Sequence, residues 1–245
     1  MSEYQESSEL RLRPVRSFVR REGRITTSQA AALRDLWPVY ALPESGPIVP
    51  AACFGRRAPL HLEIGAGDGE CMLALAEAHH EFDFIAAEVH RPGLGHLLNR
   101  LDKRGLSNVR VYGGDVNDLL ARLPDGSLSG VYVFFPDPWP KTRHHKRRLV
   151  QAPFLARLRP KLLPQGRLYV ATDIEGYAEH VIEVTAPLRD WLNLAGAARY
   201  APRLKARIVT KFERKGLREN RRIFDFCLAR APDPAPRQTA SSSER

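Results

Sequence analysis

Apolar and polar positions follow two different periods along residues 60–230. Short, mostly apolar runs predict strands at 60–64, 82–89, 108–113, 129–135 and 166–173. Apolar residues at helical spacing predict helices at 70–80, 93–104, 116–123 and 175–190, with a partly helical segment at 148–162. Strands that alternate with helices in this way form a parallel sheet covered by helices on both faces. We therefore expect a doubly wound α/β domain.

The segments around this pattern complete the predicted organisation. Residues 1–24 are polar, carry six arginines, and predict a flexible basic arm. Residues 25–58 predict a short helix followed by a loop rich in Pro and Gly, and the α/β domain is expected to span 59–231. Residues 232–245 are rich in Pro and Ser and predict a disordered tail.

The last part of the α/β domain predicts a final pair of strands. Residues 207–216 and 221–230 both carry β-branched and aromatic residues, and we expect them to pair in antiparallel fashion. The segment Thr210-Lys211-Phe212-Glu213 would then lie on the penultimate strand. Within a doubly wound fold, ligands bind at the carboxyl ends of the parallel strands, so chemistry is to be sought there.

Composition narrows the class of protein. Hydrophobic residues make up 43% of the chain and charged residues 27%, which is typical of a soluble globular protein. No apolar run approaches the roughly 20 residues that span a bilayer, and the N-terminus has no signal-peptide pattern. Three scattered cysteines, Cys53, Cys71 and Cys227, suggest neither disulfides nor a zinc site, so a reducing cytoplasm is expected.

The charge of the chain gives the first functional hint. The formal net charge is +10, and a protein this basic often binds a polyanion such as nucleic acid. A basic surface that only keeps the protein soluble would give the same number. The position of the charged residues relative to the expected active site has to decide between nucleic-acid binding and a merely solubilising surface.

The first predicted strand runs into Glu63-Ile64-Gly65-Ala66-Gly67-Asp68-Gly69. Glycines here let the backbone turn tightly and approach a ligand. A dinucleotide-binding turn would carry a third glycine at position 70, where this chain has Glu70. An acid on the strand followed by Gly65 and Gly67 fits S-adenosylmethionine better, because Glu63 can hold the cationic part of that cofactor.

Three more predicted strands end in acids. Glu88 lies at the end of the second strand and can accept hydrogen bonds from ribose hydroxyls, a feature that NAD enzymes share. Asp115 follows the third strand, where it can accept from an adenine amino group or cap the next helix. Asp173 ends the fifth strand. Acids grouped at one edge of the sheet indicate a binding site.

The fourth strand leads into Pro136-Asp137-Pro138-Trp139-Pro140-Lys141. Three prolines in five residues stiffen this loop, as a preorganised site requires. The basic run Arg143-His144-His145-Lys146-Arg147-Arg148 follows, and with Lys141 it places five Lys or Arg in eight residues. Because the run lies beside the expected cofactor pocket, we interpret it as phosphate-binding. The His pair lacks any accompanying ligand spacing, so no metal is expected.

These motifs together resemble the bacterial tRNA (guanine-N7)-methyltransferase family. The matching stretches are SFVRREGRIT (17–26), LEIGAGDGE (62–70), AEVHRPGLG (87–95), LSNVRVYGGD (106–115), FFPDPWPKTRHHKRRLV (134–150), ATDIEGYAEH (171–180) and TKFE (210–213). They follow the family's order and cover nearly all of residues 15–230. The FFPDPW stretch with its basic continuation is the most specific of them.

The resemblance implies a fold, an activity and a set of roles. The fold is a Rossmann-like class I S-adenosylmethionine-dependent methyltransferase, with a seven-stranded sheet whose last strand is antiparallel. The activity is methyl transfer to N7 of guanosine 46 in the tRNA variable loop, leaving S-adenosylhomocysteine. The sequence leaves the oligomeric state open between a monomer and a homodimer. The implied residues are Glu63, Gly65, Gly67, Glu88, Asp115 and Asp137 for the cofactor, with Asp137 also catalytic; Lys141, Asp173, Thr210, Lys211, Phe212 and Glu213 for the substrate; and Arg143, His144, His145, Lys146, Arg147 and Arg148 for RNA.

Other functions stay open at this point. Another S-adenosylmethionine-dependent methyltransferase could act on an exocyclic amine or a protein side chain, although amine methylation would favour Asn-Pro-Pro-Tyr over the Asp137 loop. A dehydrogenase is disfavoured by Glu70. A non-catalytic RNA-binding protein would explain the charge but not the acids at the strand ends. The sequence also leaves open whether Asp137 or Asp173 contacts the guanine.

Overall fold

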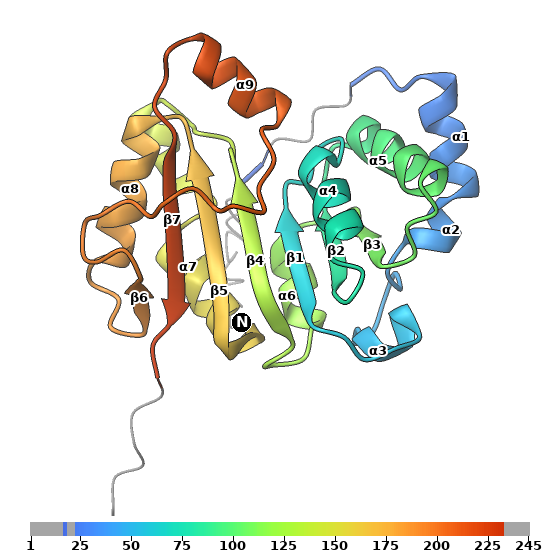
Figure 1. Ribbon diagram of the computed structural model, residues 1–245, viewed down its shortest axis with the longest axis horizontal. Coiled ribbons are helices and arrows are strands. Elements are labelled where there is room, and N and C mark those ends of the chain that lie inside the picture. Colours follow the sequence, from blue (N-terminus) through green and yellow to red (C-terminus); the bar gives the residue numbers. More distant parts are fainter. Residues whose placement is uncertain (1–16, 19–22, 233–245) are drawn as a thin grey trace, which may run out of the picture.

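A seven-stranded sheet forms the centre of the protein in the computed structural model, which describes residues 17–18 and 23–232 (Figure 1). Most of the predicted basic arm and nearly all of the predicted tail lie outside the described residues. The strand order is β3-β2-β1-β4-β5-β7-β6. The strands are β1 (Leu60–Ile64), β2 (Asp83–Ala87), β3 (Val109–Tyr112), β4 (Leu128–Phe134), β5 (Leu162–Thr172), β6 (Trp191–Asn193) and β7 (Phe224–Arg230).

Helices cover both faces of the sheet, as predicted. They are α1 (Thr27–Asp35), α2 (Trp37–Tyr40), α3 (Pro50–Phe54), α4 (Glu70–Ala78), α5 (Arg91–Lys103), α6 (Val116–Arg122), α7 (Ala152–Leu158), α8 (Glu175–Thr185) and α9 (Lys211–Arg218), with 3-10 turns η1 (Thr142–Arg147) and η2 (Arg159–Lys161). Successive residues of β4 face opposite sides. Val133 packs in the core with α6, α7 and α8, whereas Phe134 packs in the core with α4 and α5.

The direction of the strands confirms a mostly parallel sheet. Strands β1 to β5 pair in parallel, and β7 runs antiparallel to both β5 and β6. The carboxyl ends of the parallel strands therefore meet at one edge, which lies at the top of Figure 1. This edge carries the loops in which the sequence places its candidate site.

The predicted strand at 207–216 is wrong. Residues 211–218 form helix α9, and β7 pairs instead with β5 and with the three-residue strand β6. The Thr210 side chain accepts a hydrogen bond from the backbone N–H of Glu213 and so caps the helix. The spacing Thr-x-x-Glu is a sequence signal for a helix start, and here it outweighs the strand-like composition of the segment.

The N-terminal helix α1 is fixed by local and by distant contacts. Thr26 and Gln29 form a capping box at its start. Further along, Gly95 of α5 lets the helices approach closely, because a Cβ there would lie 2.8 Å from Cβ and backbone O of Gln29. Of the helices in the described part of the chain, none is long and apolar enough to cross a bilayer.

Candidate active site

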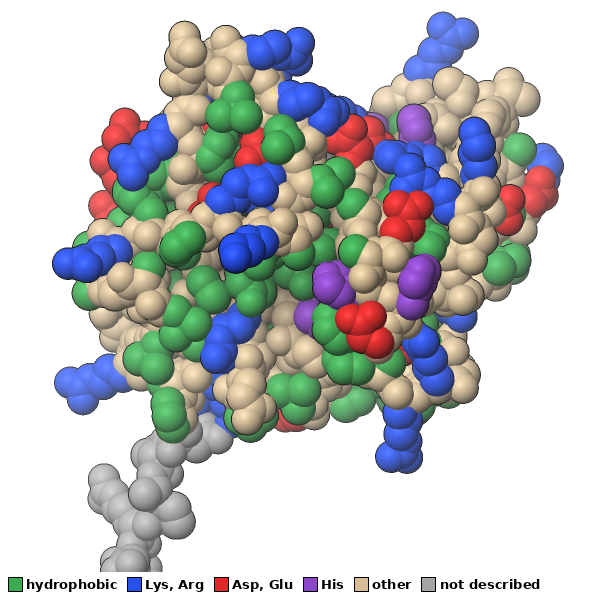
Figure 2. Space-filling view, in the orientation of Figure 1, with side chains coloured by type: hydrophobic (Ala, Val, Ile, Leu, Met, Phe, Trp, Pro, Cys, Tyr) green, Lys and Arg blue, Asp and Glu red, His purple; other side chains and the backbone are tan. Residues whose placement is uncertain are grey.

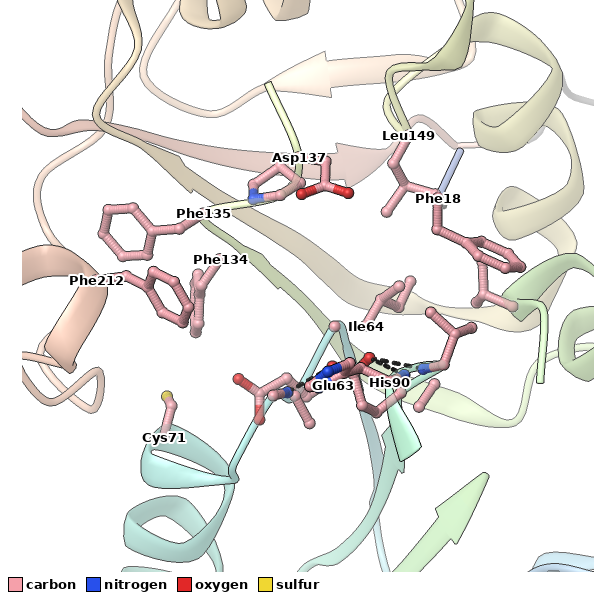
Figure 3. A pocket seen from close by; sticks show the side chains of 18 of the residues that line it. Phe18, Glu63, Ile64, Cys71, His90, Phe134, Phe135, Asp137, Leu149 and Phe212 are labelled. Atoms are coloured by element: carbon pink, nitrogen blue, oxygen red, sulfur yellow. Dashed lines mark hydrogen bonds between the residues drawn. The ribbon is translucent and has the colours of Figure 1, made fainter. Parts of the chain in front are cut away.

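One pocket lies at the carboxyl ends of β1, β2 and β4 and has a volume of about 450 Å³. In Figure 3 its aromatic residues Phe134, Phe135 and Phe212 lie on one side, Phe18 and Leu149 lie opposite, and Asp137 lies between them. Of the predicted cofactor residues, Glu63, Gly65, Gly67, Glu88 and Asp137 line it. The sheet thus brings together residues that are far apart in the sequence.

Charge alone does not locate a binding surface on this protein. Lys and Arg side chains are spread over the whole face shown in Figure 2, with acidic side chains among them. The argument for a site therefore depends on the residues around the pocket.

The glycine-rich turn forms one wall of the pocket. Gly65 and Gly67 adopt φ of 80° and 60°, which favour glycine. A Cβ at either position would meet no atom within 4 Å, since both face open space. At the other side of the turn a Cβ on Gly93 would lie 2.8 Å from the backbone O of Gly67, so the first turn of α5 packs directly against it.

Glu88 is fixed by three backbone amides. Its Oε2 accepts from Gly67 N at 2.7 Å, and its Oε1 accepts from Val89 N and His90 N, both at 2.7 Å. These hydrogen bonds are among the dashed lines in Figure 3. A carboxylate oxygen has two lone pairs, so Glu88 keeps acceptor capacity for the hydroxyls of a ligand while its orientation is set by the backbone.

Glu63 is a buried acid whose second oxygen lacks a partner. The residue is 4% exposed, and Oε2 forms no hydrogen bond with the described part of the chain. Burial, followed by the neighbouring carboxylates of Glu88 and Asp68, raises the pKa of Glu63 to about 8. A cationic ligand group would favour the ionised form and fill the open position, so the residues present fit the S-adenosylmethionine expected from the sequence.

Asp115 has the capping role that the sequence left open. Its Oδ1 accepts from the backbone N and from Nδ2 of Asn117, each at 2.9 Å, at the start of α6. Its neighbours Gly114 and Val116 line the pocket. Contact between Asp115 and the cofactor stays a prediction.

The loop that carries Asp137 is held in a strained conformation. Phe135 and Trp139 have φ of 52° and 45°, and neither is a glycine. Such residues cost on the order of 1–3 kcal/mol each and persist only where surrounding contacts enforce them. Asp137 lies between the two, exposed and facing the pocket. The prolines therefore supply only part of the rigidity that the sequence predicts for this loop. Side-chain contacts supply the rest.

Trp139 shows some of these contacts. Its Nε1 donates to the backbone O of Ser17 at 3.1 Å. The guanidinium of Arg147 lies 5.1 Å from the ring centroid, and His144 approaches edge-on at 5.7 Å. Residues 17–18 therefore lie against the loop, and Phe18 lines the pocket. The sequence stretch SFVRREGRIT includes Phe18 but carried no signal for this position.

The predicted substrate-binding residues separate into two groups. Thr210 and Phe212 line the pocket, and Lys141 is exposed just before η1. Three others form ion pairs with the rest of the chain: Asp173 Oδ2 with Arg221 Nε at 2.8 Å, Lys211 Nζ with Asp68 Oδ2 at 2.6 Å, and Glu213 with Arg203 and Arg207. Direct substrate contact by these three stays a prediction.

The basic run also divides. Arg143 and Lys146 are exposed on η1, whereas Arg148 is 4% exposed. The Arg148 guanidinium donates to the backbone O of Pro138 at 3.1 Å and of Gly176 at 2.7 Å, and stacks on Tyr177. Arg148 thus joins the Asp137 loop to α8, and its contact with RNA stays a prediction.

Two acids of the glycine-rich turn also hold α9 in place, a contact that the sequence did not reveal. Glu70 accepts from the backbone N of Lys211 at 2.5 Å and pairs with Arg214 at 2.9 Å. Together with the pair between Asp68 and Lys211, this fixes α9 above the carboxyl ends of the strands (Figure 1). Within residues 17–18 and 23–232, no group of three or more His, Cys, Asp or Glu is arranged to hold a metal ion.

Comparisons with known proteins agree with the site. A family model described as "Putative methyltransferase" matches residues 57–226. A tRNA (guanine-N(7)-)-methyltransferase of Alkalilimnicola ehrlichii is 50% identical over 226 residues, covering 91% of this chain and 95% of that protein. The protein of the same name from Methylococcus capsulatus is 48% identical over 220 residues, covering 89% and 95%.

Solved structures show the same fold at low sequence identity. The 16S rRNA methyltransferase KamB is similar with a TM-score of 0.56 at 14% identity, covering 79% of this chain and 99% of that one. The 16S rRNA (adenine(1408)-N(1))-methyltransferase from Catenulisporales acidiphilia gives a TM-score of 0.53 at 19% identity, covering 79% and 98%.

Proposed function

The chain belongs to the tRNA (guanine-N(7)-)-methyltransferase family, and on this premise we propose that it methylates N7 of guanosine 46 in the variable loop of tRNA. The observation that carries this proposal concerns two of the acids that line one pocket. Glu63 is buried at the glycine-rich turn with one oxygen, Oε2, that has no hydrogen-bond partner among the described residues, and Asp137 lies on the strained loop at the mouth of the pocket. The first suits a cationic cofactor, and the second suits a base that becomes cationic on methylation.

The glycine side of the pocket would hold S-adenosylmethionine. Glu63 would accept from the cofactor's ammonium group, Glu88 from its ribose hydroxyls, and the backbone around Gly114 and Asp115 would border its adenine. When bound, this cofactor supplies an electrophilic methyl group on a sulfonium, which loses its positive charge as the methyl passes to the acceptor. The open space at Gly65 and Gly67 lets the backbone come close to the ligand.

The residues at the mouth of the pocket would orient the guanine. Guanine N7 carries a free lone pair, so no general base is required, and the contribution of the protein is alignment and charge stabilisation. The methylated purine becomes cationic, and the Asp137 carboxylate would stabilise the charge as it develops. Phe135 and Phe212 provide apolar side chains that line this part of the pocket.

Asp137 is also the better candidate for selecting guanine. A carboxylate can accept from N1–H and N2–H₂, which adenine does not offer together. Asp173 already pairs with Arg221 at 2.8 Å, whereas Asp137 is exposed in the pocket. We therefore assign the guanine contact to Asp137.

The basic segment η1 would bind the tRNA backbone. Arg143 and Lys146 are exposed beside the loop of Asp137, where they can neutralise phosphates next to the target nucleotide. Because its proposed substrate is tRNA, we propose that the enzyme acts in the cytoplasm, and we propose a monomer or a homodimer as its oligomeric state.

The test is to incubate the protein with methyl-labelled S-adenosylmethionine and an unmodified tRNA transcript, then digest the RNA and identify the labelled nucleoside. A matched transcript with adenosine at position 46 serves as the control. N7-methylguanosine that disappears in the control supports the proposal. Label in another nucleoside would identify a different RNA methyltransferase, and unlabelled RNA with bound cofactor would contradict an action on tRNA.

A further inference from the structure

Arg207 is a fully buried cation that lies behind the wall of the pocket. Its side chain is 0% exposed, although arginine is rarely buried without partners. Nη1 donates to Glu213 Oε2 at 2.5 Å, and Nη2 donates to Oδ1 and Oδ2 of Asp225 at 2.9 and 3.0 Å. Helix α9 and strand β7 thus fix the orientation of the guanidinium from two sides.

This guanidinium lies over the rings of the two phenylalanines that lead into the Asp137 loop. Its central carbon lies 5.4 Å from the ring centroid of Phe134 and 5.5 Å from that of Phe135, within the range of cation–π contact. Both rings line the pocket (Figure 3). Phe135 is also one of the non-glycine residues with a positive φ, 52°. Its backbone N–H donates a hydrogen bond to the backbone O of Ala171 at 2.7 Å.

We propose that Arg207 is a positioning residue for methyl transfer: held by Glu213 and Asp225, its guanidinium braces Phe135 in the strained conformation that aims Asp137 into the pocket. The inference rests on the proposed function for the identity of the reaction. It gives Glu213 an indirect role, because this predicted substrate ligand is 2% exposed and is directed at Arg207. Arg203 supports the same carboxylate at 3.1 Å.

The cofactor side of the pocket is held independently of this brace. Glu88 is fixed by backbone amides of residues 67, 89 and 90, and none of these contacts involves Arg207. Loss of the brace should therefore lower kcat while the affinity for cofactor is retained. A general loss of structure would lower both together.

The experiment is a double-mutant cycle with Arg207→Lys and Phe135→Leu, and Arg222→Lys as control. Lysine keeps the buried charge but lacks the planar face that stacks on a ring. Arg222 stacks on Tyr200 at 5.3 Å and on Phe224 at 5.1 Å, so the control removes the same kind of contact outside the pocket. The measurements are kcat, KM for tRNA, the dissociation constant of S-adenosylhomocysteine and Tm.

We expect each of the two single variants to lower kcat by about 10- to 100-fold, the loss typical of a misplaced catalytic group. The cofactor dissociation constant and KM should stay within about threefold. The loss of kcat in the double variant should be smaller than the product of the two single losses, because both changes remove the contact between Arg207 and Phe135. Arg222→Lys should keep the wild-type kcat.

Two outcomes overturn the inference: an unchanged kcat in Arg207→Lys, or losses that multiply in the double variant. If Arg207→Lys does not fold, Asp225→Asn replaces it in the cycle, because this change loosens the guanidinium while its pair with Glu213 remains. Wild-type protein that forms no N7-methylguanosine would contradict the proposed function, whereas an active wild type with an equally active Arg207→Lys contradicts only the brace.

Discussion

The two sides of the pocket are built by different means. On the cofactor side, Gly65, Gly67 and Glu88 are arranged by backbone dihedral angles and backbone amides, all within residues 63–93. On the acceptor side, the loop of Asp137 is held by the side chains of Arg148 and Arg207 and by their partners on α8, α9 and β7. One side depends on short-range backbone geometry and the other on long-range charge pairing.

This difference predicts how each side fails. On the cofactor side, which is shaped by the backbone, an added methyl group should be disruptive. On the acceptor side, which is held by side chains, the loss of a charged or aromatic side chain should be disruptive. Cofactor binding and methyl transfer should therefore respond to different substitutions.

The largest effect on kcat is expected at Asp137, at the mouth of the pocket. Asp137→Ala should lower kcat by about 10²- to 10³-fold, the cost of losing a group that stabilises developing charge. The affinity for tRNA should stay within about threefold, because we propose that the phosphate contacts lie on η1. Asp125→Ala is the control, since Asp125 is 71% exposed and pairs with Lys161. Folded Asp137→Ala protein that no longer binds tRNA would contradict the assigned role.

On the cofactor side, binding should depend on pH through Glu63. Its pKa is raised to about 8, so the folded, cofactor-free protein holds a proton that the unfolded chain releases. The free energy of unfolding then falls as the pH rises from the ordinary range of glutamic acid to about 8. A cationic ligand requires the ionised form, so the dissociation constant of the cofactor should fall about tenfold per pH unit below 8.

Calorimetry between pH 6 and 8 measures this dependence, and two buffers of different ionisation enthalpy report the released proton. Glu63→Gln should bind more weakly and lose the pH dependence. A flat profile in the wild-type protein would show that Glu63 is already ionised before the cofactor binds.

Adding a single methyl group at Gly93 should disturb the glycine-rich turn on the cofactor side and weaken cofactor binding. In Gly93→Ala the new Cβ would lie 2.8 Å from the backbone O of Gly67, and the forced shift costs about 1–3 kcal/mol. The affinity for cofactor should fall about tenfold on this scale. Gly176→Ala is the matched control, because a Cβ there meets nothing within 4 Å on α8. That change should stabilise the fold by about 0.5–1 kcal/mol. If Gly93→Ala and the wild-type protein bound the cofactor with equal affinity, this would contradict the close packing of Gly93 against the backbone of Gly67.

The smallest effect separates two arginines of the basic run. Arg143, which is exposed on η1, should act as one phosphate contact, so Arg143→Ala should weaken tRNA binding a few-fold and lower the slope of log K against log salt by about 1. Arg148→Ala should instead lower Tm, because its guanidinium holds the backbone of Pro138 and Gly176. A salt slope that changes only in Arg148→Ala would reverse the assignment.

The sequence identified residues that meet on the glycine side of the pocket because their determinants are local. The glycine spacing, Glu63 within β1 and Glu88 directly after β2 are encoded within short segments. The parallel sheet follows from apolar runs between helical segments. The family resemblance and the mostly parallel fold were both confirmed.

The acceptor side was less predictable because its determinants are distant contacts. The composition of 207–216 resembles a strand, yet Ile208, Val209 and Phe212 are 38%, 41% and 55% exposed, and the cap at Thr210 starts a helix. The pairing of Arg207 with Glu213 and Asp225 depends on the placement of β7 beside β5. No local pattern marks an arginine as buried, so this residue was missed.

The position of β7 in the sheet has a consequence for synthesis on the ribosome. Strands β1 to β4, with the glycine-rich turn and Glu88, are complete once residue 134 has emerged, but β7 enters between β5 and β6 only with the last described residues. A domain generally folds as a unit, and the pairing of Arg207 with Asp225 requires β7 to be in place. Unfinished chains that lack β7 would therefore also lack this pairing, and we expect them to be inactive until synthesis is nearly complete.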